Sequence, residues 1–408
     1  MQDGSYDVVI AGGGFVGRAL ALALAKFAPD GFRIALIDAE APGAEREDAR
    51  ASALSAASRN LLSVLGVWPA LAPDAQAIES IEITDSQLNA ALRPHLLGFE
   101  AELKPGVVAY MVENRDLHRA LAAHLRDIEP IVVIAPQTIV DYRADAFRLA
   151  VKLGSGNEIE APLIVAADGK RSRLRERAGI KCIAWSYPQM GIVTTVAHSK
   201  PHGGKAVQHF LPAGPFAILP LRGDRSSIVW TEDTERARAI LAQDESGFLD
   251  ELATRFGHQL GEIAVAGPVQ SFPLDFQLAR SFVADRLALA GDAAHAVHPL
   301  AGQGLNIGFR DVAALAQTIV EATRLGLDIG TEPVLERYER WRRFDSTFSA
   351  TAMDGLNRLF SSDSAALRAL RDLGLGLVDR APPLKRFLVR EAAGHTGQVP
   401  RLLRGEGL

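Results

Sequence analysis

The sequence predicts an α/β protein built on a Rossmann-like domain, with an inserted, mainly antiparallel β-sheet domain and a C-terminal helical region. Three observations support this fold class. A glycine-rich turn joins a strand to a helix near the N-terminus. Short strands without long helices between them fill the middle of the chain, and apolar residues recur at helical spacing towards its end.

The composition bounds what the protein can be. Its 408 residues suffice for two or three domains with a sizeable core. A formal net charge of -5 leaves no basic footprint, so nucleic acid is not expected as a partner. The single cysteine, Cys182, excludes an internal disulfide and a cysteine-based metal cluster, and no metal site is expected. The chain shows no secretory signal and no apolar run of about 20 residues, which predicts a cytoplasmic protein.

The N-terminal stretch carries the most specific motif. Residues 6–11 predict a β-strand, and G-x-G-x-x-G follows at once at residues 12–17. Apolar residues at helical spacing then lead to a second strand, residues 33–37, which ends in Asp38. Strand, glycine-rich turn, helix and an acid about 20 residues on form the dinucleotide-binding fingerprint. The alternative is a glycine-rich turn that holds no ligand.

Each residue of this fingerprint has a physical task. We expect Gly12 to make the tight turn and Gly14 to let a pyrophosphate approach the backbone. Gly17 would let the helix pack closely on the strand. Asp38 would accept hydrogen bonds from an adenosine ribose.

A second strand–turn–helix unit lies between residues 285 and 311. Leu287 to Ala290 predict a buried strand, which Gly291-Asp292 ends, and Gly302-Gln303-Gly304 precedes a helix that begins near Leu305. An acidic turn beside a helix N-terminus suits a flat, polar, partly anionic ligand. The alternative is an ordinary turn without a ligand.

A third unit ends in Asp168-Gly169, directly after the apolar strand at residues 163–167. The basic residues that follow could form a solvated helix face or could face a phosphate, and both readings stay open. They are Lys170, Arg171, Arg173, Arg175 and Arg177. Arg50, in a polar loop, could likewise meet a phosphate or be an ordinary surface arginine.

The middle of the chain predicts the inserted domain. Residues 131–161 predict a meander that covers one face of a sheet. Four further strands, at residues 190–197, 206–211, 216–221 and 226–231, lack the helices that parallel crossovers need. The predicted division has three parts. The dinucleotide-binding domain spans 1–75, 105–180 and 270–345, the substrate domain spans 76–104 and 181–269, and the C-terminal helical region spans 346–408.

The C-terminal region combines apolar spacing with positive charge. Residues 365–390 contain six basic and two acidic side chains. Such a segment packs on its own domain, or it faces an anionic membrane surface or a partner protein.

Taken together, these motifs resemble the FAD-dependent aromatic hydroxylases built like para-hydroxybenzoate hydroxylase, and within them the ubiquinone-biosynthesis hydroxylases. G-x-G-x-x-G, the Asp-Gly motif and the Gly-Asp motif occur in the right order. The narrower resemblance rests on GDAAHAVHPLAGQGLNIGFRD (291–311), DARASALSAASRNLLSVLGVW (48–68), WSYPQ (185–189) and FLPAGPFAILPL (210–221). It covers nearly the whole chain. Asp38 stands where the family often has Glu, and its shorter side chain can still reach a ribose.

The resemblance implies an FAD-binding domain of the glutathione-reductase type, NADH or NADPH as electron donor, and O2 as co-substrate. It implies hydroxylation of the ring of a polyprenylated phenol and leaves the ring position open. Other ubiquinone-biosynthesis proteins and the inner face of the membrane would be possible contacts. The residues expected to bind the cofactor are Gly12, Gly14, Gly17, Asp38, Arg50, Arg115, Asp168, Gly291, Asp292, Gly302, Gln303, Gly304, Leu305 and Asn306.

The resemblance also places candidate residues around the reacting ring. Pro299 and Leu300 would lie near the reacting carbon, and His298 could act as an acid or base, although a structural histidine is the alternative. The substrate pocket would include Phe210, Phe216, Leu219 and Pro220. Two other functions stay open: hydroxylation of a small soluble aromatic such as a hydroxybenzoate, and a non-catalytic flavoprotein that binds quinone or partner proteins.

Overall fold

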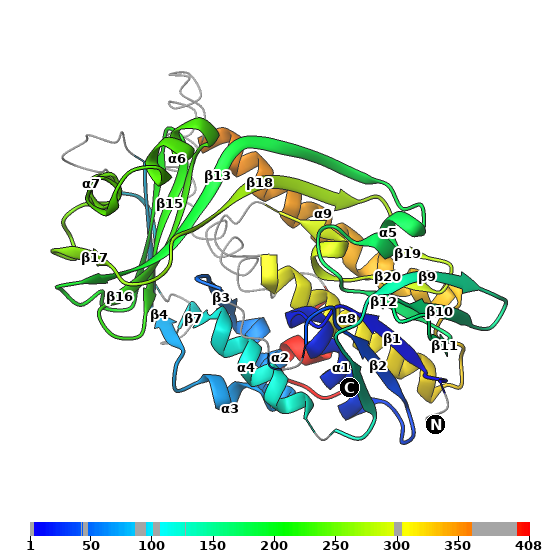
Figure 1. Cartoon of the computed structure of the whole chain (residues 1–408). Coiled ribbons are helices and arrows are strands. Elements are labelled where there is room, and N and C mark those ends of the chain that lie inside the picture. Colours follow the sequence, from blue (N-terminus) through cyan, green and yellow to red (C-terminus); the bar gives the residue numbers. More distant parts are fainter. Residues whose placement is uncertain are drawn as a thin grey trace.

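The structure is a computed structural model that describes residues 4–41, 43, 48–85, 95–100, 107–126, 128–297, 304–360 and 398–408 (Figure 1). One domain is built on a mainly parallel sheet in the order β19-β20-β12-β1-β2-β8. Only β19 runs antiparallel to its neighbour. These strands are β1 (Val8–Ala11), β2 (Ile34–Ile37), β8 (Ile131–Ile134), β12 (Ile164–Ala166), β19 (Val283–Ala284) and β20 (Leu287–Leu289).

The central strands of this sheet are apolar throughout because both of their faces are covered. Every residue of β1, β2, β12 and β20 is buried, as expected for a parallel sheet between layers. α1 (Phe15–Phe27) and α8 (Gly304–Arg324) pack against each other and share this core. α4 (Asn114–Leu125) packs beside α1, and β9 (Ile139–Ala144), β10 (Leu149–Leu153) and β11 (Glu158–Ala161) form an antiparallel meander.

A second, larger sheet forms the inserted domain and lies apart from the parallel sheet in Figure 1. Its order is β21-β18-β13-β16-β15-β14-β5-β6, with β17 on β13, and its pairs are antiparallel except β14–β5. The strands are β5 (Ser80–Asp85), β6 (His95–Glu100), β13 (Cys182–His198), β14 (Lys205–Leu211), β15 (Gly214–Leu221), β16 (Arg225–Asp233), β17 (Ile263–Val265), β18 (Gln270–Ala279) and β21 (His295–Ala296).

One face of this larger sheet packs under two helices, α6 (Thr234–Leu241) and α7 (Glu245–Phe256). Side chains alternate between the faces of a strand, so every second residue belongs to this helix-covered core. Phe216, Ile228 and Trp230 are among them. The other face is left for the cavity described below.

Smaller elements connect the two domains. β3 (Ala51–Ser55), β4 (Gln76–Ile78) and β7 (Ala109–Glu113) form a separate antiparallel sheet, and α2 (Ala56–Val64) and α3 (Trp68–Leu71) follow β3 along the chain. α5 (Arg173–Arg177) and the 3-10 turn η1 (Gly291–Ala293) complete the turns after β12 and β20.

The C-terminal part differs from the predicted helical region at 346–408. α9 (Glu332–Phe360) crosses the predicted boundary without a break. The last residues include η3 (Arg401–Arg404) and return to the dinucleotide-binding domain, where Leu402 and Leu403 are fully buried and Asn60 donates a hydrogen bond to the Leu403 carbonyl (3.2 Å). The chain end is therefore part of the first domain's core. Residues 365–390 lie outside the described part.

The predicted fold class is confirmed, with two corrections to strand membership. β8, predicted as the start of a meander, joins the parallel sheet beside β2. β18, predicted to belong to the dinucleotide-binding domain, pairs with β13 in the larger sheet, so the chain returns near residue 280 rather than 270. Among the described helices, none is both long and apolar enough to cross a membrane.

Candidate active site

A cavity of about 720 Å³ lies between the two domains. On one side it is lined by the turns that follow β1, β2, β12 and β20 and by the first turn of α8. On the other side it is lined by the helix-free face of the larger sheet. Ligands of open α/β folds bind at the carboxyl ends of the strands, so the position is the expected one.

The glycine-rich turn after β1 shows three different uses of glycine. Gly12 has φ +108°, and a Cβ there would lie 2.2 Å from the carbonyl oxygen of Ala167. A Cβ at Gly17 would lie 1.9 Å from the carbonyl oxygen of Gly12, so α1 packs directly on the turn. A Cβ at Gly14 would meet no protein atom within 4 Å. Gly14 thus borders open cavity, while the other two are required by the protein's own packing.

The N-terminus of α1 opens into this cavity. Gly14 is its N-cap residue, and within the described part of the chain no side chain accepts a hydrogen bond from the first turn. Its backbone N–H groups therefore remain available, and the helix dipole adds a partial positive charge. This arrangement binds phosphate in dinucleotide folds.

Asp38, at the end of β2, is 7% exposed and lines the cavity. It accepts a hydrogen bond from the backbone N–H of Glu40 (3.2 Å) and forms a loose ion pair with Arg18 (3.5 Å). A Cβ at Gly13 would collide with its carboxylate at 1.9 Å. A carboxylate held this close to the glycine turn suits two ribose hydroxyls.

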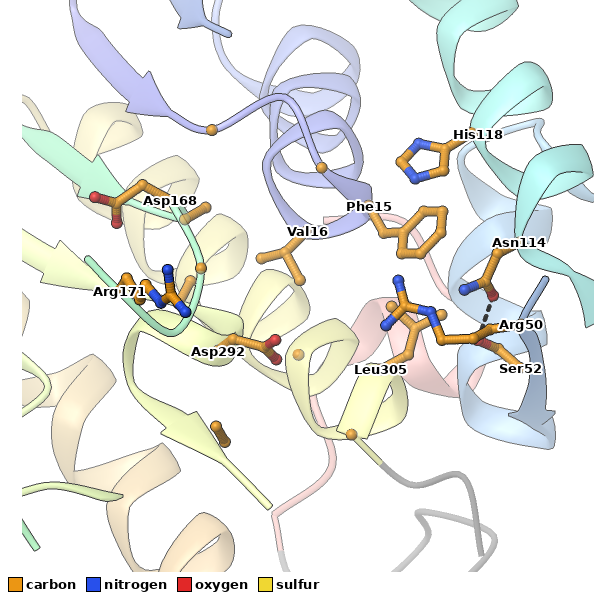
Figure 2. Close-up of a pocket in the computed structure, with 18 of the residues that line it drawn as sticks. Phe15, Val16, Arg50, Ser52, Asn114, His118, Asp168, Arg171, Asp292 and Leu305 are labelled. Atoms are coloured by element: carbon orange, nitrogen blue, oxygen red, sulfur yellow. Dashed lines mark hydrogen bonds between the residues drawn. The ribbon is translucent and has the colours of Figure 1, made fainter. Parts of the chain in front are cut away.

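The Gly291-Asp292 turn packs against the start of α1. Gly291 has φ +64°, and a Cβ there would lie 2.9 Å from Val16. Asp292 and Arg50 extend toward the middle of the cavity from different sides (Figure 2). The Asp292 carboxylate is open to the cavity but enclosed by protein on its other sides, and this partial removal from water raises its pKa, which His295 and Arg50 oppose.

A buried ionic network supports this turn from below. The fully buried Asp311 accepts hydrogen bonds from the backbone N–H of Gly291 (2.9 Å), from Arg342 Nε (2.8 Å) and, at 2.7 Å, from His295 Nε2. Burial alone would raise the pKa of Asp311, but His295 and Arg342 outweigh burial and lower it. His295 therefore has a structural partner, and α9, which carries Arg342, fixes the turn.

Arg50 is held at the cavity by its own carboxylate partner. Its guanidinium pairs with Asp48 through Nε (2.7 Å) and Nη2 (2.8 Å) and lies 6.0 Å from the Phe272 ring. Asn114 donates to the same Asp48 (2.9 Å) and accepts from Ser52 (2.7 Å). Figure 2 shows Arg50, Ser52 and Asn114 beside Phe15 and Leu305.

Arg115 does not line the cavity, contrary to the sequence-based prediction. It is half-exposed and pairs with Glu113 at 2.8 Å. Asn114 and His118 line the cavity instead. Residues four apart share one face of a helix, whereas Arg115 is rotated by about 100° from Asn114. The i, i+4 pair in NRDLH was the sequence signal for the two residues that the prediction missed.

The Asp-Gly turn after β12 contributes Asp168 to the lining. Burial raises the pKa of its carboxyl, which hydrogen bonds from Ser172 and from the α5 backbone oppose. Its Oδ1 is buried and has no hydrogen-bond partner among the described residues. An unpaired buried carboxylate oxygen at the cavity edge is consistent with a ligand hydroxyl or amide as the absent partner.

The basic run after this turn divides into different roles. Arg171 and Arg173 line the cavity. Arg175 is buried and donates to the carbonyls of Lys170 and Ala293 (3.0 Å each), which ties the Asp-Gly turn to the Gly-Asp turn. The remaining two pair with carboxylates, Lys170 with Asp275 and Arg177 with Asp141 (2.7 Å).

The first turn of α8 closes the cavity floor with Gly304 and Leu305. The Asn306 side chain is buried and committed elsewhere: it donates to the Ala53 carbonyl (2.8 Å) and accepts from Ser58 Oγ (2.7 Å). Only its backbone can serve the predicted cofactor role. The other residues predicted in this stretch, His298, Pro299, Leu300, Gly302 and Gln303, lie outside the described residues.

The predicted substrate-pocket residues separate by sheet face. Leu219 lines the cavity, together with Pro215 and Ala217 of the same strand. Phe216 is a correction, because it points to the helix-covered core and is fully buried there.

Pro220, on the same side of β15 as Phe216, is a second correction. Phe210 pairs with Pro215 on the cavity side of β14 but is buried and does not line the cavity. Alternate residues of β15 face opposite sides of the sheet. Once one residue is known to face the cavity, this alternation assigns Leu219 to the cavity side and Phe216 and Pro220 to the other side.

The chain matches the FAD binding domain family over residues 5–344. It is 44% identical to ubiquinone hydroxylase UbiL of Rhodospirillum rubrum, over 98% of this chain and 92% of that protein. It is 36% identical to 3-demethoxyubiquinol 3-hydroxylase of Escherichia coli, over 97% of this chain and all of that protein. Human mitochondrial ubiquinone biosynthesis monooxygenase COQ6 is 31% identical, over 96% of this chain and 93% of that protein.

Among solved structures, p-nitrophenol 4-monooxygenase PnpA from Pseudomonas putida DLL-E4 superposes with a TM-score of 0.77. The match covers 96% of this chain and all of that chain at 19% identity, so it shows the common fold.

Proposed function

This chain belongs to the FAD-dependent monooxygenase family that includes the ubiquinone-biosynthesis hydroxylases, and we propose that it hydroxylates the ring of a neutral polyprenylated phenol. FAD is its cofactor, and NAD(P)H is the reductant of such enzymes. When bound, FAD supplies the oxygen activation, and the protein's residues bind, orient and exclude water.

The observation that favours a neutral substrate is the absence of charge on the sheet wall, the cavity wall that the larger sheet forms. Each described cavity-lining residue from β13–β16 and β18 is uncharged. Arg222, just beyond β15, points away from the cavity, where it is 63% exposed and bonds Asp74 (3.0 Å). A carboxylate buried against this wall would lack a cation, which is unfavourable. A hydroxybenzoate is therefore the poorer candidate.

The opposite wall suits the dinucleotide. The free N–H groups at the start of α1 would bind the pyrophosphate, with Gly14 giving it room. Asp38 would accept hydrogen bonds from the adenosine ribose. Asp292 would accept them from the ribityl chain, and Arg50 would balance negative charge in the same space.

Residues at the edges of this site would also contact the cofactor or the substrate. The unpaired oxygen of Asp168 would receive a hydrogen bond from the cofactor. Backbone amides at the start of α8 would face the flavin ring, and Pro299, Leu300 and His298 are proposed near the reacting carbon on sequence grounds alone.

The decisive experiment measures NAD(P)H oxidation by the purified FAD-loaded protein. A neutral prenylated phenol should stimulate oxidation and gain one oxygen atom by mass spectrometry, whereas 4-hydroxybenzoate should do neither. A flavoprotein without catalytic turnover would show no phenol-stimulated rate. In cells, the lipid that accumulates in a deletion strain would identify the missing hydroxyl group.

We also propose peripheral membrane or partner contact for residues 365–390 of an otherwise cytoplasmic protein. The segment lies outside the described residues, so the proposal rests on its basic, apolar composition and on a bilayer-resident substrate. Truncation before residue 365 would also remove the buried Leu402 and Leu403, so charge substitution is the cleaner test. Changing Arg368, Arg371, Lys385 and Arg386 to Gln should reduce binding to anionic vesicles without loss of FAD. Unchanged vesicle binding would refute the membrane contact.

A further inference from the structure

The cavity-facing side of the larger sheet is a regular grid. Backbone pairing aligns Leu219 with Ser227, Gln208 with Ala217 and Val229, and Thr231 with Gly191. Because alternate residues face one side, these positions form three successive rows across β14, β15, β16 and β13. The middle row is apolar at its centre, and polar side chains surround it.

Three of these polar side chains carry an atom that finds no partner in the described part of the chain. Gln208 Nε2, Ser227 Oγ and Thr231 Oγ1 are buried atoms without a hydrogen bond among the described residues, and all three residues line the cavity. Ser227 is 1% exposed and Thr231 is 2% exposed. Leaving such a group unsatisfied costs about 1–3 kcal/mol, and native proteins rarely keep several together.

Polar residues on the other face of the same strands do have partners. Ser226 bonds His198 Nε2 (3.1 Å), and Glu232 pairs with Arg255 (2.8 Å) and accepts from Trp230 (3.2 Å). On β14, β15 and β16, the unpaired buried atoms among the described residues are thus confined to the cavity side. Thr231 is also fixed in place, because a Cβ at Gly214 would lie 2.6 Å from the Thr231 methyl, so that methyl packs against the glycine.

Each of the three groups can donate a hydrogen bond, and none is charged. Ser227 and Thr231 are four residues apart on β16, which corresponds to about 13 Å. Two hydrogen bonds of about 2.8 Å then leave about 7 Å between the partners, room for an aromatic ring with oxygen atoms on opposite sides. Gln208, two strands away, can reach a third position.

We propose that Gln208, Ser227 and Thr231 form a specificity rim that recognises uncharged oxygen substituents, hydroxyl or methoxy, on the substrate ring. This inference rests on the proposed function and defines the substrate class more closely. The rim favours rings that carry several oxygen atoms over alkylphenols of the same shape. A site built to hydrogen-bond an oxygen rejects the analogue without it, because its own polar groups are then left unpaired.

The first test needs no catalysis. Replacing the unpaired groups by apolar residues of similar shape, as in Thr231→Val and Ser227→Ala, should leave the melting temperature unchanged or raise it. Thr194→Val is the matched control, since Thr194 bonds the Gly267 carbonyl (3.2 Å) and its loss should lower the melting temperature. A clear loss of stability in Thr231→Val would show a structural partner and overturn the proposal.

The second test measures ligand binding to the FAD-loaded protein through the flavin absorbance. The ligands are 2-methoxyphenol and 2-ethylphenol with the same short prenyl chain, which differ in one oxygen atom. Wild-type protein should bind the methoxy compound about 5- to 30-fold more tightly. The triple variant Gln208→Leu, Ser227→Ala, Thr231→Val should lose this preference, and Thr231→Val alone provides a milder variant. Thr195→Val, on the same face but outside the cavity lining, should keep it.

The outcomes are distinguishable. If the triple variant keeps the wild-type preference, the rim does not read oxygen, and only this inference fails. If the wild-type protein binds neither phenol and neither stimulates NAD(P)H oxidation, the proposed function fails, and the inference fails with it. Loss of preference with retained stability and retained FAD supports the rim.

Discussion

The cavity has two walls that are built differently. The nucleotide wall consists of the turns after β1, β2, β12 and β20 and the first turn of α8, and the sheet wall is the helix-free face of the larger sheet. On the nucleotide wall, the protein itself anchors Arg50 and the Gly291-Asp292 turn before any ligand arrives: Arg50 pairs with Asp48, and Asp311 holds Gly291 from below. On the sheet wall, three neutral polar groups have no partner among the residues that the structure describes. A wall that binds the same cofactor in every turnover is preorganised by the protein itself. A wall that selects a substrate keeps its hydrogen-bonding capacity for that substrate.

The largest effects are expected from substitutions in the glycine-rich turn, where Gly14 borders the open cavity and Gly17 packs against the protein's own backbone. Gly14→Val should abolish FAD binding but leave the fold intact, because its side chain enters the cavity rather than the protein. Gly17→Ala should instead destabilise the protein, since its Cβ would collide with the Gly12 carbonyl oxygen. Flavin absorbance and melting temperature separate the two outcomes. Full flavin occupancy in Gly14→Val would disprove the pyrophosphate assignment.

The next effect tests the support beneath the nucleotide wall. Arg342→Met should cost about 3–5 kcal/mol, because it leaves Asp311 buried without its cation. Denaturant unfolding measures the loss, and Arg343→Met, at an exposed position on the same helix, should change stability by about 0.5 kcal/mol or less.

The pH dependence of this variant follows from the direction of the pKa shift. In the wild-type protein the lowered pKa of Asp311 stabilises the fold above its unfolded pKa, and this contribution is lost as pH falls through the folded value. Without Arg342, one of the two partners that lower this pKa is gone while burial still acts to raise it, so the pKa of Asp311 should rise. The deficit of Arg342→Met should therefore be larger at pH 8 than at pH 5. A deficit that does not change with pH would contradict this.

A smaller effect is expected at Asp292, whose carboxylate faces the cavity. Asp292→Ala should weaken FAD binding by about 1.5–3 kcal/mol, the range of hydrogen bonds to charged groups, and leave the protein folded. Asp285→Ala, exposed and outside the cavity lining, is the control. Flavin titration measures both. Unchanged affinity and turnover in Asp292→Ala would remove its cofactor role, and unfolding would indicate a structural one.

The smallest effect concerns Arg222 and tests the neutrality of the sheet wall. Because Arg222 bonds Asp74 and points away from the cavity, Arg222→Ala should change the apparent affinity for a neutral phenol by about twofold or less. A large loss would place a cation at the substrate. Steady-state kinetics with a prenylated phenol and with 4-hydroxybenzoate make the comparison.

Much of the fold could be predicted because its signals are local. The strand–glycine–helix order at residues 6–27, the strand that ends at Asp168-Gly169 and the absence of long helices between residues 190 and 231 each depend on near neighbours in the chain. Backbone freedom at glycine and the periods of helix and strand act within a few residues. The sequence by itself therefore determined the fold class and the three turns that line the cavity.

Only the tertiary structure decided which side chains of those elements meet. Arg115 and Phe216 were predicted in the site, but one helix position and one strand face turn them away. In the basic run, Arg175 became a tie between two turns, while Arg171 reached the cavity. The chain end returned to bury Leu403. Which face of a helix or strand turns toward the site is set by packing against segments far away in the chain. A local pattern gives the period of an element but not the direction in which its packing partner lies.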